Sequence, residues 1–183
     1  MASVLILLAE GFEELEAVTI IDVLRRAEID VTVAGLKEGA VKSARGIRII
    51  PDTTLDEVKD KDFDMVVLPG GQPGTDNLAA DERVKELIRK MYSKGKYTAA
   101  ICAAPYVLSE AGVLKEKAAT SYPTFQEKLK AKEVVPSEKV VIDGNVVTSQ
   151  GPGTALNFAL KLVELFKGKE KAQEISKAML VNI

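Results

Sequence analysis

The sequence predicts an α/β protein: a flavodoxin-like, three-layer sandwich with a mainly parallel central sheet and helices on both faces. Short apolar runs alternate along the chain with segments of helical periodicity, which is the pattern of stacked βαβ units. The first run, at 4–9, is apolar throughout, as expected of a strand buried on both faces. No internal repeat or low-complexity tract interrupts the alternation.

In the first half of the chain, the run at 4–9 is followed by a helix expected from about Glu13 to Ala27. Its apolar face is assigned to residues that recur every three positions: Leu15, Val18, Ile21 and Leu24. Alternating apolar residues at 29–33 predict a second strand, and residues 40–50 predict a short hairpin that turns near Arg45 and Gly46.

The middle of the chain repeats the strand–helix order. Residues 65–71 predict a strand that ends in a Pro-Gly-Gly turn, and 81–93 predict an amphipathic helix. The inward residues of that helix are expected to be Val84, Leu87, Ile88 and Met91. The segment 97–105 predicts a strand that leads directly into Cys102 and then into a helix.

The C-terminal part begins with a hairpin, because Gly144-Asn145 separates two short apolar runs at 139–143 and 146–149. A helix is expected at 154–166. Its aligned apolar residues are Leu156, Leu160, Val163 and Phe166. A final helix at 169–178 is expected to be solvated.

Length and composition indicate a single domain over residues 1–183, with an apolar fraction of 46% that supplies one sizeable core. The 25 basic and 27 acidic residues give a net charge of −2, which argues against a general nucleic-acid surface. The sequence contains no His, which excludes a Ser-His or Cys-His dyad and a His-ligated metal. Cys102 is the only cysteine, so the chain can form neither an internal disulfide nor a CxxC motif.

The expected location is the cytoplasm. The run at 4–9 is too short to span a membrane, no basic residue precedes it, and no typical cleavage site follows it. A single Cys favours a reducing compartment. Few Asn and Gln residues, together with basic residues that are mostly Lys, favour a heat-adapted source.

Cys102 is the main candidate for a reactive group. It lies at a strand-to-helix junction, the setting of a nucleophile elbow, where helix N–H groups favour a thiolate. Small residues, Ala103 and Ala104, leave room for a tight turn. A buried structural cysteine is the alternative, and the spacing alone leaves both interpretations open.

Acidic residues open the first helix. For Glu13 and Glu14 the ordinary explanation is that acidic side chains favour a helix N-terminus. Glu16 lies one turn further, between apolar positions, and a carboxyl that faces inward there would have a raised pKa and could donate a proton.

Two glycine-rich segments lie near the expected site. Gly70 and Gly71 could present N–H groups to an oxyanion, or could form a plain turn. The segment 69–74 lacks the spacing of a dinucleotide-binding loop and the Lys of a phosphate loop. The segment 149–154 more simply starts the last large helix.

Four segments together resemble the ThiJ/PfpI superfamily, and most closely its Parkinsonism-associated deglycase subfamily and bacterial homologues. They are LAEGFEELEAV, VLPGGQPG, AAICAAP and TSQGPGTALNFAL, in this order along nearly the whole chain. The resemblance implies one flavodoxin-like domain, related to class I glutamine amidotransferases, and a homodimer without a cofactor or a metal.

The resemblance also implies roles for individual residues. Cys102 matches the family nucleophile, and Glu16 matches the glutamate that holds a proton beside the thiolate. The N–H groups of Gly71 and Ala103 match oxyanion-hole positions. Arg45 matches a basic residue that comes from the neighbouring subunit.

The chain departs from the pattern at two further positions, where some relatives have His and Arg. These are Tyr122 and Gln150, which we group with Gly70 as substrate-binding or supporting positions. The missing His argues against the intracellular peptidase and amidotransferase chemistries of the superfamily. The surviving mechanism must therefore use Cys102 and Glu16.

The expected function is a cysteine-dependent glyoxalase or deglycase that acts on methylglyoxal, glyoxal or early glycation adducts. The alternative is a peroxide-responsive sensor or stress chaperone that uses oxidation of Cys102. Neither function requires a membrane or a specific nucleic acid.

Overall fold

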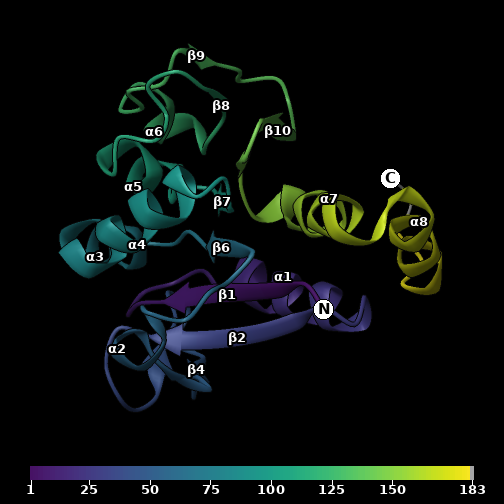
Figure 1. Ribbon diagram of the computed structural model, residues 1–183, viewed down its shortest axis with the longest axis horizontal. Coiled ribbons are helices and arrows are strands. Elements are labelled where there is room, and N and C mark those ends of the chain that lie inside the picture. The colour runs from purple at the N-terminus through teal and green to yellow at the C-terminus, as the bar shows by residue number, and fades with distance from the viewer. Residues whose placement is uncertain (182–183) are drawn as a thin grey trace.

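The computed structural model describes residues 1–181 and confirms the three-layer α/β architecture (Figure 1). A seven-stranded sheet has the order β10-β11-β7-β6-β1-β2-β5, in which only β10 runs antiparallel to its neighbour. Its strands are β1 (Ser3–Leu8), β2 (Asp30–Gly35), β5 (Thr53–Thr54), β6 (Met65–Leu68), β7 (Tyr97–Ile101), β10 (Val140–Asp143) and β11 (Val146–Ser149).

Two small ribbons accompany the main sheet. One is the expected hairpin, formed by β3 (Val41–Lys42) and β4 (Arg48–Ile49), and the other pairs β8 (Ala118–Ala119) with β9 (Glu133–Val134). The helices are α1 (Glu14–Arg26), α2 (Leu55–Val58), α3 (Gly74–Ala80), α4 (Glu82–Ser93), α5 (Pro105–Glu110), α6 (Pro123–Gln126), α7 (Ala155–Lys167) and α8 (Lys169–Ala178), with a 3-10 turn at Pro152–Thr154.

Helices cover both faces of the sheet because its central strands are apolar on both sides. In β1, Val4, Ile6 and Leu8 pack against α1, α7 and α8. The alternate residues, Leu5 and Leu7, face the core on the side of α2, α3, α4 and α5. In Figure 1 the α3–α5 group and the α7–α8 pair lie on opposite sides of the sheet.

The expected apolar face of α1 is wrong at its first turns, whereas Leu24 is buried as expected and Ile21 packs partly buried against the core. Leu15 and Val18 are 51% and 48% exposed. The buried apolar residues of α1 are instead Ala17, Ile20, Val23 and Leu24. The helix carries two apolar stripes, and the three-residue spacing selected the stripe that faces outward at its first turns.

Three smaller expectations also change. α3 was not expected, because its sequence lacks a helical apolar period. α8 has the expected bounds but is not simply solvated, since Ala172 and Ile175 are buried in the core formed with α7. In α7, Leu160 and Val163 are buried, whereas Leu156 and Phe166 pack only partly buried against the same core.

Candidate active site

Neighbouring strands bring the candidate residues to one edge of the sheet. The parallel strands β1, β6 and β7 lie side by side, so the loops after their carboxyl ends meet. Open α/β sheets form their sites at this edge. The loop after β1 leads to Glu16, the loop after β6 contains Gly70 and Gly71, and Cys102 directly follows β7.

Cys102 is held in a strained backbone conformation. Its φ of 65° lies in the left-handed region, which is unfavourable for a residue with a Cβ. Its N–H donates to Ser149 O at 3.0 Å, and its carbonyl accepts from the N–H of Tyr122 at 2.7 Å. These bonds fix the main chain on both sides, while the side chain stays partly exposed and reachable.

Glu16 is fully buried beside Cys102, in the first turn of α1. Its Oε2 accepts a hydrogen bond from the N–H of Gly70 at 2.8 Å. Its Oε1 accepts none from the described residues. A protonated carboxyl would remove this deficit, because the O–H group could donate to the sulfur of Cys102.

Burial dominates the titration of Glu16. Loss of hydration raises the pKa of its carboxyl from 4.5 to about 7, and the nearby charge of Glu13 acts in the same direction. The hydrogen bonds from Gly70 and Cys102 oppose this shift and are weaker. The carboxyl therefore gains or loses its proton near neutral pH, which suits a group that carries protons in catalysis.

The expected lowering of the Cys102 pKa does not occur. Burial raises the pKa of the thiol from 9.0 to about 12, and the charge and hydrogen bond of Glu16 add to the shift. The N–H groups of Ala103 and Gly71 donate to the sulfur and lower the pKa, as expected, but by less. The helix at this junction, α5, begins only at Pro105, with Ala104 as its N-cap residue.

Cys102 and Glu16 therefore titrate as one pair. Two ionisable groups in contact lose their protons in two steps that belong to the pair. Between about pH 7 and 12 the pair holds one proton and one negative charge. When that proton is on Glu16, the charge that opposes a thiolate is absent and the sulfur keeps its two N–H donors.

Two glycines allow the loops that carry Glu16 and Cys102 to come close together. A Cβ at Gly70 would lie 2.6 Å from the Cβ of Cys102 and 3.0 Å from Oε2 of Glu16. Gly71 has a φ of +93°, and a Cβ there would lie 2.3 Å from the backbone N of Glu13. The pair of glycines is thus more than a plain turn, because any side chain would push the three loops apart.

The remaining candidates lie around this centre in different ways. Tyr122 is 43% exposed, and its ring packs over the backbone of Gly151, just beyond β11. Gln150 turns its amide to the carbonyl of Pro136. Arg45 is exposed at the tip of the β3–β4 hairpin, and only its N–H contacts the start of α1, at Oε2 of Glu14.

Sequence reasoning missed Ser149, whose carbonyl holds the N–H of Cys102. The pairing of β11 with β7, in which Ser149 lies opposite Ile101, is the signal that would have placed it. Among residues 1–181, no cluster of three or more His, Cys, Asp or Glu side chains could hold a metal ion. No helix in that range is long and apolar enough to cross a bilayer.

Comparison with known proteins shows the family and the fold. The profile of the DJ-1/PfpI family matches residues 2–165, and the chain belongs to this family. Protein dj-1beta of Drosophila melanogaster is 49% identical over 181 residues, which cover 98% of this chain and 97% of that protein. The glutathione-independent glyoxalase DJR-1.2 of Caenorhabditis elegans is 40% identical over 178 residues, 97% and 95% of the two chains.

Solved structures show the same fold. The crystal structure of Drosophila melanogaster DJ-1beta has a TM-score of 0.96 at 49% identity, with 100% of this chain and 99% of that chain covered. The structure of oxidized Toxoplasma gondii DJ-1 has a TM-score of 0.96 at 34% identity, with 100% of both chains covered. At the level of the family, the relatives support glyoxalase- or deglycase-type chemistry on small reactive carbonyls.

Proposed function

We propose that this protein is a cofactor-free, glutathione-independent glyoxalase that converts methylglyoxal and glyoxal to lactate and glycolate. The observation that carries the proposal is the buried Glu16 carboxyl, with a pKa of about 7, beside a cysteine whose sulfur receives two N–H donors. A nucleophile, a proton carrier and an oxyanion site are the three parts that this reaction needs.

The first step is addition to the aldehyde. The sulfur of Cys102, with the shared proton on Glu16, attacks C1 of methylglyoxal and forms a C–S bond. The aldehyde oxygen takes the proton from Glu16, which gives a hemithioacetal and leaves Glu16 as a carboxylate. The N–H groups of Gly71 and Ala103 point to the sulfur and serve the oxygen that develops next to it.

The second step moves hydrogen between carbons. The Glu16 carboxylate removes the proton on C1, and the resulting enediolate is reprotonated at C2 by the same carboxyl, while the hydroxyl proton passes from O1 to O2. The product is a lactoyl thioester of Cys102. Water hydrolyses this thioester to lactate and restores the thiol, so the net reaction is methylglyoxal plus water to lactate.

The residues around the centre fit supporting roles. Gly70 orients Glu16 through its N–H group, and the N–H of Tyr122 holds the carbonyl of Cys102. Gln150 steadies the segment before Gly151 through Pro136. No step needs a metal or a cofactor, and the absence of His from the sequence disfavours peptidase chemistry. We place this chemistry in the cytoplasm, where a lone cysteine stays reduced.

The test is turnover of methylglyoxal by pure protein, followed as loss of the aldehyde and formation of lactate. Cys102→Ser removes turnover, and Glu16→Gln lowers it about 10²–10⁴-fold, the usual contribution of an acid–base group. Ser93→Ala, at the exposed end of α4, is the matched control and keeps the wild-type rate. Undiminished turnover by a folded Cys102→Ser protein would exclude the proposal.

Deglycase activity is the finer alternative for the same site. The early glycation adducts of methylglyoxal form reversibly and dissociate without an enzyme. Removal of the free aldehyde by a glyoxalase therefore also lowers the amount of adduct. The two activities separate when the initial rate of adduct loss is compared with the rate of spontaneous dissociation. Loss faster than dissociation, dependent on Cys102, assigns a deglycase, and loss at the dissociation rate assigns a glyoxalase.

We also propose that the protein is a homodimer. Leu15, Val18, Ile47 and Ile50 are large apolar side chains exposed on α1 and the β3–β4 hairpin region. Exposed apolar groups that gather on one face mark interaction sites, and a second copy would cover them. Arg45, on the same hairpin, would then lie at the dimer interface.

The oligomeric state tests this part separately. Sedimentation analysis should give a dimer for the wild type and a monomer for Val18→Glu. Ile142→Glu, at an exposed apolar position on β10, is the control and should remain a dimer. A monomeric wild type at micromolar concentration would refute the dimer without affecting the proposed chemistry.

A peroxide sensor is the second candidate function. The partly exposed, N–H-bonded sulfur of Cys102 and the lack of another cysteine favour it, because no internal thiol can resolve a sulfenic acid. Limited peroxide should then convert Cys102 mainly to the sulfinic acid, with loss of turnover, as intact-protein mass spectrometry would show. Oxidation of the Met residues while Cys102 stays a thiol would exclude this function.

A further inference from the structure

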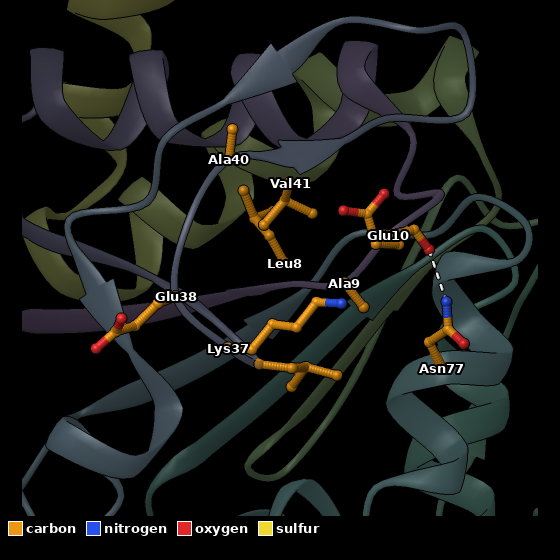
Figure 2. Close-up of a pocket in the computed structure, with 9 residues that line it drawn as sticks. Leu8, Ala9, Glu10, Lys37, Glu38, Ala40, Val41 and Asn77 are labelled. Atoms are coloured by element: carbon orange, nitrogen blue, oxygen red, sulfur yellow. Dashed lines mark hydrogen bonds between the residues drawn. The ribbon is translucent and has the colours of Figure 1, made fainter.

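A pocket lies at the same edge of the sheet as Cys102, at the ends of β1 and β2 (Figure 2). Its volume is about 420 Å³, within the range of small-molecule sites, which is about 300–1,000 Å³. None of the residues discussed around Cys102 lines it. The lining residues are Leu8, Ala9, Glu10, Leu36, Lys37, Glu38, Ala40, Val41 and Asn77.

The walls of this pocket are held by hydrogen bonds between its elements. The amide of Asn77, on α3, donates to the carbonyl of Glu10 at 2.8 Å, the bond drawn in Figure 2. The N–H of Gly11 donates to the carbonyl of Lys42 at 2.8 Å and ties the loop after β1 to β3. The pocket is therefore largely formed without a ligand.

Two opposite charges face this pocket without pairing. The Lys37 side chain extends across the pocket, with its ammonium group toward Ala9 (Figure 2). Glu10 lies near Val41, and its Oε2 accepts from the N–H of Lys42 at 3.3 Å. Within residues 1–181, neither Lys37 nor Glu10 forms an ion pair with the other or with any other side chain. The Glu38 carboxylate points away from the Lys37 ammonium group (Figure 2).

We propose that this pocket binds a free α-amino acid with an aliphatic side chain. Lys37 would receive the ligand carboxylate and Glu10 the ligand ammonium group, each as a charge-assisted hydrogen bond. Leu36 and Ala40, which both reach solvent, supply apolar surface for the aliphatic side chain, and the buried Leu8 and Val41 lie beneath them. Lys37 and Glu10 together complement a zwitterion, whereas an anion or an amine alone would leave one of these two charges unmatched; Glu38, the second carboxylate at the pocket, points away from Lys37.

This proposal does not rest on the proposed glyoxalase function. Gly11 separates the pocket from the β6 loop, because it packs directly against Pro73 and Gly74. The ligand would therefore bind beside the site of Cys102 and not in it, so its affinity should be unchanged in Cys102→Ser. A failure of the catalytic proposal would leave the amino acid site standing.

The experiment is calorimetric titration of the full chain with leucine, 3-methylbutylamine and 4-methylpentanoate. Leucine should bind at least about tenfold more tightly than either monovalent analogue, the effect of one charge-assisted hydrogen bond. Lys37→Met should reduce the affinity for leucine to that for the amine, and Glu10→Gln should reduce it to that for the carboxylate. Glu38→Gln, which removes a charge at the same pocket, should keep the wild-type affinity.

Circular dichroism would establish that each variant is folded, which is expected because the changed side chains reach solvent. The proposal is overturned if leucine gives no saturable heat at millimolar concentration. It is also overturned if leucine binds equally well to Lys37→Met and Glu10→Gln, or if Cys102→Ser abolishes binding, since the ligand would then occupy another site.

Discussion

Glu16 should make the stability of this protein fall as the pH rises toward neutrality. The carboxyl keeps its proton up to about pH 7 in the folded protein, whereas its ordinary pKa is 4.5. Between these values the unfolded chain has lost a proton that the folded protein still holds. The free energy of unfolding therefore decreases with increasing pH over this window.

The size of the effect follows from the shift. Each pKa unit corresponds to 1.36 kcal/mol, so a shift from 4.5 to about 7 corresponds to about 3 kcal/mol. Glu16→Gln has nearly the same shape, can still accept from Gly70, and has no charge to bury. The free energy of unfolding of Glu16→Gln, measured relative to that of the wild type, should therefore rise by about 3 kcal/mol between pH 4 and pH 8. This corresponds to a relative rise of about 6–12 °C in Tm.

The assay is urea unfolding of both proteins at several pH values, read as the difference between the two curves. A constant offset from altered packing would not matter, because the test is the change of the difference with pH. Glu174→Gln, exposed on α8, is the control, and its curve should run parallel to that of the wild type. Parallel curves for Glu16→Gln as well would refute the raised pKa.

Three further outcomes follow from the site. Alkylation of Cys102 by iodoacetamide should rise through about pH 7, where the pair loses its first proton, and Glu16→Gln should move this step upward toward the ordinary thiol value of 9.0 or beyond. Glu13→Gln should move it slightly downward, because the Glu13 charge contributes to the raised pKa of Glu16. Gly70→Ala should lower both Tm and turnover, since the new Cβ would lie 2.6 Å from the Cβ of Cys102; wild-type values for both measurements would show that the loops can separate without loss.

The sequence alone predicts the layers of this fold because buried parallel strands are apolar throughout and their order alternates with helices. It does not predict which stripe of α1 is buried. Both stripes are apolar, so Val18 and Ile20 are equivalent in a hydropathy pattern although one is exposed and the other buried. The choice depends on α7, which packs against α1 and lies far away along the chain.

The site shows the same division between local and distant information. Cys102 and Glu16 could be assigned to one edge from the positions of strand ends, which are local features. The direction of the Cys102 pKa could not, because it depends on how deeply the fold buries the thiol and on the distance to a carboxylate from another element. The α3 helix was not predicted for a related reason. Its buried residues include Gly74 and Thr75, which do not contribute to an apolar pattern.

The left-handed backbone of Cys102 has a consequence for any effort to improve the protein. A residue with a Cβ costs about 1–2 kcal/mol at that φ, and glycine avoids this cost. Random mutagenesis screened for heat resistance alone should therefore enrich Cys102→Gly, a variant without a thiol. A screen must retain a readout of the thiol at every round, because at this position survival on heating and chemical reactivity select for different amino acids.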